Sequence, residues 1–289
     1  MGVLFLGGDE RQRTACAYLN EHGIKSEAWY GDVRFDEDII MRISSSEVIV
    51  LPLPVSNDSL TLNMSYITEP APKLEKIISL IKPQTLVIGG KFDRSLKSDL
   101  EDRKIKYIDY FEDESFQIKN AVLSAEGAIQ VAMNLSKASI FNSKIAIIGY
   151  GRIGKLLSQK LFVLGADVTV CARKNSDLAW AEGFGYKSFP IRQSGASSSL
   201  SELSSGYNII FNTAPSQILD EDFAARLDPD TLIIELASAP FGIDEKIVSR
   251  YGLNYIKALG IPGKYYPISA GEITGKAVMS ILEKEGIVL

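Results

Sequence analysis

The stretch Lys144-Ile145-Ala146-Ile147-Ile148-Gly149-Tyr150-Gly151-Arg152-Ile153-Gly154 joins an apolar, β-branched run to a GxGxxG motif. Such a run is typical of a buried parallel strand, and residues 155–161 carry apolar side chains at helical spacing. A second apolar run follows at residues 168–171, so the stretch has the composition and size of a βαβ unit. An ordinary strand, turn and helix is the alternative, but this context favours dinucleotide binding.

Each glycine of the motif has an expected role. Gly149 permits a tight turn, Gly151 lets the backbone approach a pyrophosphate, and Gly154 lets helix and strand pack closely. The start of the helix offers unpaired N–H groups and the positive end of its dipole to phosphates. Two later loops at strand ends are expected to complete the site, which gives the cofactor-binding set Gly149, Tyr150, Gly151, Arg152, Ile153, Gly154, Thr213, Ala214, Pro215, Ala237 and Ser238.

The end of the second expected strand decides which dinucleotide fits. NAD-binding units usually carry Asp or Glu there, about 20 residues after the glycines, to bond the ribose hydroxyls. This chain has Cys171-Ala172-Arg173-Lys174 and no carboxylate. An arginine accommodates the 2′-phosphate of NADP in a planar, bidentate manner, and a lysine adds a point charge. We therefore expect Arg173 and Lys174 to favour NADP over NAD; a solvated pair of cations, or an Arg173 stacked on adenine, is the alternative.

Composition narrows the class of protein. The chain has 289 residues, enough for two domains, with 46% hydrophobic and 23% charged residues, as in soluble globular proteins. A net charge of −5 without a basic stripe argues against a nucleic-acid binder. Cys16 and Cys171 are too few and too far apart for a disulfide framework or a metal site, which fits a reducing cytoplasm. The N-terminal residues lack the basic flank of a signal peptide, and no apolar stretch reaches membrane-spanning length.

The order of expected elements predicts an α/β protein with two halves. Strands are expected at residues 3–6, 26–30, 48–51, 85–88, 107–109, 144–148, 168–171, 208–212, 231–235 and 254–257. Helices are expected at residues 11–22, 36–44, 73–81, 93–102, 116–137, 155–161 and 269–285. Residues 57–66 are expected to form a loop or an irregular hairpin, and residues 194–205 a loop with one helical turn.

Alternation of strands and helices indicates parallel sheets with right-handed crossovers. We expect two Rossmann-like, doubly wound parallel-sheet domains joined by a hinge helix. Residues 1–118 form a flavodoxin- or Rossmann-like substrate domain, and residues 119–267 form the dinucleotide-binding domain with the hinge helix. The last helix, residues 268–289, is expected to pack back on the first domain.

Several loops at strand ends could bind an anionic substrate, because ligands of open α/β sheets bind beyond the carboxyl ends of the strands. Residues 7–11, Gly-Gly-Asp-Glu-Arg, follow the first strand and place Arg11 beside backbone N–H groups. A glycine turn with surface arginines is an equally good interpretation. Lys264 and Ser269, with the N–H groups of Ala270 and Gly271, are expected to reach the same cleft as Arg11 and to bind carboxylates.

The chain lacks an obvious general acid or base. Its single histidine, His22, precedes Gly23 at a helix end, where it is better explained as a structural cap. Lys91, which follows a strand-end glycine pair, and Glu126, in the hinge helix beside Ser124, are the candidate catalytic residues. Small residues around Glu126 suggest a close-packed stretch, so its carboxylate is either a satisfied structural acceptor or the proton acceptor.

Together these segments resemble the D-2-hydroxyacid and alanine dehydrogenase superfamily and, more closely, the family formed by the A subunits of dipicolinate synthase in spore-forming bacteria. The resemblance covers essentially the whole chain and rests on the order and spacing of residues 7–11, 120–128, 236–238, 258–264 and 269–273. Leu123-Ser124 stands where that family commonly has Pro-Thr, and Phe241 where a second glycine is expected.

The resemblance implies NADP-dependent oxidation of dihydrodipicolinate to pyridine-2,6-dicarboxylate, a branch of the lysine and diaminopimelate pathway. It implies a small dicarboxylate substrate and a flavoprotein-like partner, the B subunit of dipicolinate synthase. It also implies a homo-oligomer and a place in the cytoplasm of the mother cell during sporulation. Ser124 is among the substrate-binding residues that it suggests. Removing hydride from a dihydropyridine yields an aromatic ring, so positioning supplies much of the catalysis.

Two other functions remain open at this point. One is a stand-alone 2-hydroxy- or 2-amino-acid dehydrogenase, against which the missing acid–base pair counts. The other is a non-catalytic, dinucleotide-sensing subunit whose partner performs the chemistry.

Overall fold

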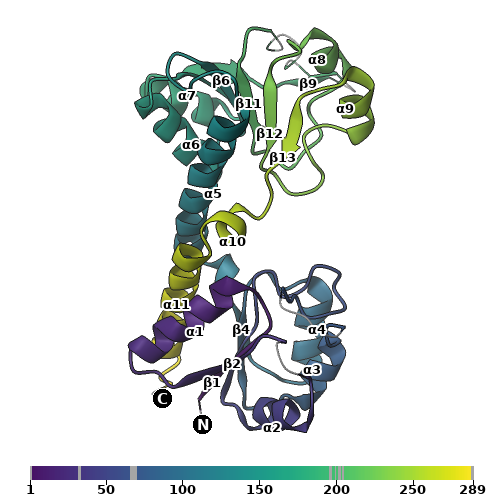
Figure 1. The fold of residues 1–289 in the computed structure, drawn as a ribbon, viewed down its shortest axis with the longest axis vertical. Coiled ribbons are helices and arrows are strands. Elements are labelled where there is room, and N and C mark those ends of the chain that lie inside the picture. The colour runs from purple at the N-terminus through teal and green to yellow at the C-terminus, as the bar shows by residue number, and fades with distance from the viewer. Residues whose placement is uncertain are drawn as a thin grey trace. The chain divides into compact units, whose positions relative to one another are not determined.

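The computed structural model describes residues 2–31, 34–65, 70–194, 197–198, 200, 203 and 205–287. The chain divides into two compact units, drawn in Figure 1: unit 1 is Met1–Asn120 with Pro262–Leu289, and unit 2 is Ala121–Ile261. The divisions expected from the sequence lie after residues 118 and 267, so residues 119–120 and 262–267 fall in a different unit from the one expected.

Unit 1 contains a five-stranded, wholly parallel sheet in the order β2-β1-β3-β4-β5. Its strands are β1 (Val3–Leu6), β2 (Ser26–Trp29), β3 (Val48–Val50), β4 (Leu86–Gly89) and β5 (Tyr107–Asp109). Its helices are α1 (Glu10–Glu21), α2 (Glu37–Ser45), α3 (Leu74–Leu80), α4 (Arg94–Asp102), the 3₁₀ turn η1 (Tyr110–Glu112), α10 (Ile261–Tyr265, whose first residue is in unit 2) and α11 (Pro267–Lys284).

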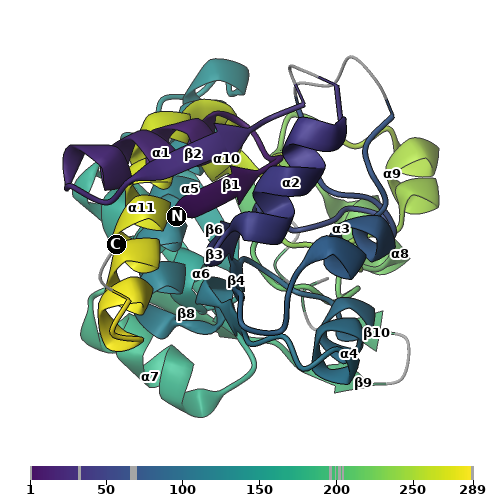
Figure 2. The ribbon, with the colours of Figure 1, turned by 90° about the horizontal axis from the view of Figure 1, so that it is seen from below.

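Each face of the unit 1 sheet is covered by helices, which is why its strands read as continuous apolar runs. One face packs on α2, α3 and α4, through buried side chains such as Ile43, Ile77 and Leu100. The other packs on α1 and α11, through side chains such as Leu19 and Leu282. Figure 2 shows α1 beside α11 and, apart from them, α2, α3 and α4.

Helices α1 and α11 cross at unusually short range because α11 carries glycines at the crossing. A Cβ on Gly271 would lie 2.4 Å from Thr14 Cβ and 2.7 Å from the backbone oxygen of Arg11. A Cβ on Gly275, one turn later, would lie 2.7 Å from the ring of Tyr18. The last helix of the chain is thus seated directly on the first helix of unit 1.

Unit 2 contains a six-stranded, wholly parallel sheet in the order β13-β12-β11-β6-β7-β8. Its strands are β6 (Lys144–Ile148), β7 (Asp167–Ala172), β8 (Lys187–Pro190), β11 (Ile209–Asn212), β12 (Leu232–Glu235) and β13 (Tyr255–Lys257), with a short antiparallel pair, β9 (Gln193–Ser194) and β10 (Ser197–Ser198). Its helices are α6 (Arg152–Val163), α7 (Asn175–Gly183), α8 (Glu221–Arg226) and α9 (Glu245–Tyr251), and α5 (Glu114–Leu135) begins in unit 1 and continues into unit 2.

Both sheets are doubly wound, and each has a point where the strand order reverses. In unit 1 that point lies between β1 and β3, and in unit 2 between β6 and β11. The strand order of unit 2 is that of the Rossmann fold. The expected fold class, two Rossmann-like parallel-sheet α/β domains, is confirmed, and ligands of such sheets bind at the carboxyl ends of the strands that flank the reversal.

Some expectations fall partly outside the described residues. The segment at residues 57–66 is described as far as residue 65. Within it, Thr61 forms an isolated antiparallel β-bridge with Lys73. Much of the predicted loop at 194–205 lies outside the described residues. In the part of the chain that is described, no helix is long and apolar enough to cross a membrane.

The α1–α11 crossing predicts a large stability difference between two glycine-to-alanine variants. Gly271→Ala should lower the free energy of unfolding by about 1–3 kcal/mol, because the added methyl group meets backbone and a β-branched side chain. Gly183→Ala, in α7, places its methyl group in open space and should be neutral or slightly stabilising. Urea unfolding of both variants measures the difference, and equal stabilities would contradict the close crossing.

Candidate functional site

The glycine turn after β6 packs against, and is hydrogen-bonded to, the loop after β11. Gly149 has φ +96°, a left-handed conformation that favours glycine, and a Cβ there would lie 2.5 Å from Thr213 Oγ1. That hydroxyl donates to the backbone oxygen of Ile148 at 2.9 Å. The two loops at the point of reversal are therefore joined by one side chain, Thr213, which the sequence predicted as a cofactor-binding residue.

The other two glycines of the motif differ in their surroundings. A Cβ on Gly154 would lie 2.2 Å from the backbone oxygen of Gly149, so helix α6 can pack on the turn only without a side chain there. A Cβ on Gly151 would meet no protein atom within 4 Å. The backbone of Gly151 is also extended, a conformation that any residue can adopt. Packing therefore requires Gly154 but leaves Gly151 unexplained, as expected if a ligand approaches the backbone at Gly151.

The first turn of α6 suits an anion. Gly151 is its N-cap and supplies no side-chain acceptor, and the first intrahelical bond runs from the Lys155 N–H to the Gly151 oxygen at 2.9 Å. The N–H groups of Ile153 and Gly154 consequently have no intrahelical acceptor. Tyr150 is buried beside this turn, where burial raises the pKa of its phenol. This geometry fits the pyrophosphate of a dinucleotide.

Arg173 and Lys174 lie where the sequence predicted, directly after β7. Both side chains are exposed, and Lys174 is the N-cap residue of α7, without a side-chain hydrogen bond to that helix. Among the described residues, neither cation forms an ion pair within 4.0 Å. They therefore stand beside the start of a second helix with their charges uncompensated by a nearby carboxylate.

A buried carboxylate organises the loops after β11 and β12, and sequence reasoning missed it. Glu235 ends β12 and is fully buried. One carboxylate oxygen accepts from Asn212 Nδ2 at 2.7 Å and from the Ala237 N–H at 3.0 Å. The other accepts from the Gly242 N–H at 2.8 Å and from the Tyr255 hydroxyl at 3.3 Å. The sequence does place this glutamate at the end of an apolar run, and that pattern could have singled it out.

This network requires Tyr255 to remain a donor and Gly242 to remain a glycine. Burial, and then the Glu235 carboxylate, raise the pKa of Tyr255 far above its usual range, so the phenol stays protonated at neutral pH. A Cβ on Gly242 would lie 2.4 Å from Asn212 Nδ2. The loop of residues 239–242 is thus drawn onto the buried carboxylate.

Several predicted cofactor contacts are already engaged within the chain. The Ala214 N–H donates to Asn212 Oδ1 at 3.2 Å, and the Ala237 N–H is held by Glu235. Pro215 and Ser238 are exposed. The N–H groups of Ala214 and Ala237 are therefore already bonded within the chain.

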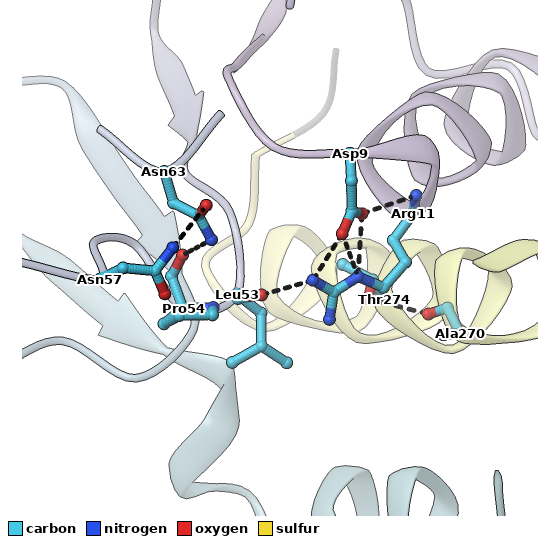
Figure 3. A network of polar contacts seen from close by, with 8 residues as sticks. All are labelled: Asp9, Arg11, Leu53, Pro54, Asn57, Asn63, Ala270 and Thr274. Atoms are coloured by element: carbon cyan, nitrogen blue, oxygen red, sulfur yellow. Dashed lines mark hydrogen bonds and ion pairs between the residues drawn. The ribbon is translucent and has the colours of Figure 1, made fainter. Parts of the chain in front are cut away.

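In unit 1 the arginine of an Asp9–Arg11 ion pair also bonds to the loop that follows β3 (Figure 3). Asp9 caps α1 by accepting from the Arg11 N–H at 3.0 Å, and its carboxylate also binds Arg11 Nε at 2.9 Å and Nη2 at 2.7 Å. Arg11 Nη2 donates in addition to the backbone oxygen of Leu53 at 2.7 Å. The Nε and Nη2 side of the guanidinium is thus occupied, and Nη1 is the nitrogen that takes no part in these bonds.

The same loops are fastened at a second point. Asn63 Nδ2 donates to the backbone oxygen of Pro54 at 2.9 Å, and Asn57 Nδ2 donates to Asn63 Oδ1 at 3.0 Å, as Figure 3 shows. The Gly8 N–H donates to the backbone oxygen of Asn63 at 2.8 Å. The N–H of Gly8 is therefore not available to an anion, contrary to the predicted anion-binding loop.

The segment that precedes α11 lies against Arg11, as expected. A Cβ on Gly263 would be 2.9 Å from Arg11 Nε, so Gly263 and its exposed neighbour Lys264 share a region with the guanidinium. Ser269 is exposed in the first turn of α11.

The predicted assistance from Ala270 and Gly271 is wrong. Helix α11 begins at Pro267, two residues earlier than expected, so the Ala270 N–H is already bonded to the backbone oxygen of Tyr266 at 2.9 Å. Gly271 is buried in the crossing with α1 and serves packing.

Lys91 lies in the loop after β4. Its φ is +61°, and its N–H donates to Asp109 Oδ1 at 2.9 Å. The preceding Gly90 N–H donates to the backbone oxygen of Pro52 at 3.3 Å, which ties this loop to the one that follows β3. The Lys91 side chain is exposed.

The environment expected for Glu126 is wrong. Its side chain is 44% exposed and forms an ion pair with Lys160 at 3.0 Å. Lys160 lies near the end of α6 that is remote from the glycine motif, so a role as proton acceptor loses its support. Small residues line the opposite, buried face of α5, where Ser124 lies. His22 is the C-cap of α1, and its Nδ1 lies 2.8 Å from the backbone oxygen of Tyr18.

The described residues contain no group of three or more histidine, cysteine, aspartate or glutamate side chains that could hold a metal ion. The polar groups that gather at the carboxyl edges of the two sheets are instead backbone N–H groups, arginine, lysine and two buried or half-buried carboxylates.

Comparison with known proteins agrees with this fold. D-lactate dehydrogenase of Escherichia coli, at 12% identity, matches with a TM-score of 0.68 over 100% of this chain and 98% of that chain, which shows a common fold.

Residues 2–111 match the family model described as the N-terminal domain of the A subunit of dipicolinate synthase. The A subunit of dipicolinate synthase from Bacillus subtilis (strain 168) is 27% identical over 291 residues, 97% of this chain and 95% of that protein. The crystal structure of the A subunit of dipicolinate synthase from Bacillus halodurans matches with a TM-score of 0.85 at 25% identity, over 97% of each chain. The resemblance of this chain to the A subunits of dipicolinate synthase is therefore confirmed over nearly its whole length.

Proposed function

We propose that this chain is the dehydrogenase subunit of a dipicolinate synthase, which oxidises dihydrodipicolinate to dipicolinate with NADP as acceptor. The observation that carries the proposal is the open backbone at Gly151, in a chain that resembles the A subunit of dipicolinate synthase along nearly its whole length. By the same resemblance, we infer that the reaction takes place in the cytoplasm of the mother cell during sporulation.

The proposed dinucleotide site lies at the carboxyl edge of the unit 2 sheet. The N–H groups of Ile153 and Gly154 bind the pyrophosphate, and Gly151 leaves room for it. Arg173 and Lys174 bind the 2′-phosphate of NADP. Thr213 and Glu235 act as positioning residues, because they hold the loops on either side. When bound, the nicotinamide supplies the hydride acceptor.

The proposed substrate site lies in unit 1. Arg11 Nη1, Lys264 and Lys91 are the cations for the two carboxylates of the substrate, with the Ser269 hydroxyl as a further donor. Asp9 fixes the guanidinium in one orientation, so that little side-chain freedom is lost when a carboxylate binds. Proton removal needs little help from the protein, because loss of hydride and a proton makes the ring aromatic.

The need for a partner follows from the name of the relatives, which describes one subunit of a synthase. We propose that the partner is the flavoprotein-like B subunit of dipicolinate synthase, and that it is needed for full turnover. A stand-alone 2-hydroxy-acid dehydrogenase is disfavoured, because the chain's one histidine lies at the C-cap of α1, without a carboxylate partner among the described residues.

A direct assay separates the possible functions. Purified chain, dihydrodipicolinate and NADP should produce reduced nicotinamide, detected by its near-ultraviolet absorbance, with a higher rate when the partner is added. If NADP binds but is not reduced in either mixture, the chain is instead a non-catalytic, dinucleotide-sensing subunit. Oxidation of 2-hydroxy acids but not of dihydrodipicolinate would overturn the proposed substrate.

The open position at Gly151 predicts a loss of binding without a loss of stability. Gly151→Ala should unfold at the same urea concentration as the wild type, because its methyl group meets no protein atom. The same methyl group occupies the approach of the pyrophosphate and should weaken NADP binding by about tenfold or more, measured by calorimetric titration.

Gly154→Ala is the matched control, since its Cβ would lie 2.2 Å from a backbone oxygen and should lower stability itself. Unchanged NADP affinity in Gly151→Ala would remove this loop from the binding site.

The cations after β7 predict cofactor preference. NADP should bind several-fold more tightly than NAD, with a difference that shrinks as salt rises, because both cations are exposed. Arg173→Ala should weaken NADP binding by about tenfold, the size of a lost charge-assisted hydrogen bond, and leave NAD almost unchanged. The exposed Arg103→Ala, in unit 1, is the control. Equal affinities for NADP and NAD at low salt would contradict the assignment.

A further inference from the structure

Unit 1 contains a cavity of about 290 Å³ that belongs to neither proposed ligand site. It lies between β5 with η1, the start of α5 and the later turns of α11. Ser280, on its wall, is about three helical turns beyond Ser269, which corresponds to about 16 Å along the axis of α11. The cavity is therefore distinct from the end of α11 that carries the proposed substrate-binding serine.

The base of the cavity is apolar. Tyr110 and Phe116 line it and are buried, with ring centroids 4.8 Å apart. Ile108, Ile273 and Ile281 also line it and are partly buried. Side chains of this kind favour an apolar group over water, and neighbouring rings favour an aromatic one.

The mouth of the cavity carries lysines. Lys119 of α5 and Lys276 and Lys284 of α11 line the cavity, and all three are exposed. Among the residues that the structure describes, none of the three forms an ion pair within 4.0 Å. Lys276 lies 5.8 Å from the centroid of the Tyr18 ring, a contact that leaves its charge in place. The mouth therefore favours an anion.

The carboxylates on the same wall are already bonded. Asp109 accepts three backbone N–H bonds of 2.8 to 2.9 Å. Asp113 accepts two hydrogen bonds, of 2.5 and 2.8 Å, from the first turn of α5, and Glu285 is paired with Lys106. With Lys106, four lysines stand against these three carboxylates, so the cavity keeps an excess of positive charge.

We propose that this cavity binds a small aromatic carboxylate, with its ring on the apolar base and its carboxylate at the lysines of the mouth. The volume lies at the lower end of the range of about 300–1,000 Å³ that small-molecule sites span, which suits a single ring. The ligand is either the product of the proposed reaction or an aromatic monocarboxylate. The inference does not depend on the proposed reaction.

Benzoate is the first probe. Added to the purified full chain, it should shift the methyl NMR signals of Ile273 and Ile281 saturably, with a Kd on the order of 1 mM or below. Ile268, beside Ser269 at the start of α11, should not follow the same titration. Benzamide, the neutral analogue, should bind about tenfold more weakly, and added salt should weaken the binding of benzoate but not of benzamide.

Variants separate the charge of the cavity from its shape. Lys119→Met with Lys284→Met keeps two apolar stems and removes two charges, so it should weaken benzoate binding about tenfold and leave benzamide binding unchanged. Ser280→Phe fills the cavity from α11 and should abolish the binding of both probes. The matched control is Lys82→Met with Lys246→Met, two exposed lysines outside the cavity, which should bind benzoate as the wild type does.

Pyridine-2,6-dicarboxylate is the second probe, and it distinguishes the two sources of the ligand. Tighter binding of the dicarboxylate at Ile273 and Ile281 supports the site with the proposed product as its ligand, and tighter binding of benzoate supports it with a monocarboxylate. If neither probe shifts these two signals saturably, the proposal is overturned. Equal affinity of the two lysine double variants for benzoate also overturns it. Either failure leaves the reduction of NADP, measured separately, as the test of the proposed function.

Discussion

At two of the closely packed glycines, only a hydrogen atom fits between elements on which a candidate site depends. One is Gly154, whose missing Cβ would lie 2.2 Å from the backbone oxygen of Gly149, and the other is Gly271, where α11 crosses α1. The first sets the distance between α6 and β6, and therefore the position of the N–H groups at the start of α6. The second seats the C-terminal helix on α1, and therefore places Gly263 against Arg11. Each candidate site depends on one of these contacts.

A carboxylate at the carboxyl edge of each sheet then fixes the loops. Asp9 holds the guanidinium of Arg11, which in turn reaches the Leu53 carbonyl, and Glu235 gathers Asn212 and the loop that ends at Gly242. A buried carboxylate is costly unless donors surround it, and Glu235 accepts four hydrogen bonds. Most polar groups of these loops are therefore hydrogen-bonded within the protein. A ligand must then be bound by the few N–H groups and cations that are not.

Features that depend on consecutive residues could be predicted from the sequence, whereas features that depend on a helix face or a distant loop could not. The glycine motif, the parallel strands and the cations after β7 are local patterns, and the structure has them where they were expected. Glu126 was misjudged because its small neighbours lie on the buried face of α5 and it does not. Glu235 was overlooked because its partners come from three other segments, and the engaged fork of Arg11 depends on a carbonyl 42 residues away.

The distribution of titratable groups fits a reaction that is limited by orientation. Asp9, Glu235 and Tyr255 are each committed to a structural hydrogen bond. Burial also raises the pKa of Tyr255 and keeps it protonated, so it cannot act as a base at neutral pH. An enzyme that reduces a ketone would need a group free to exchange a proton at this point. The proposed oxidation of a dihydropyridine needs a firmly oriented substrate, and an arginine that Asp9 immobilises is suited to orient a bound carboxylate.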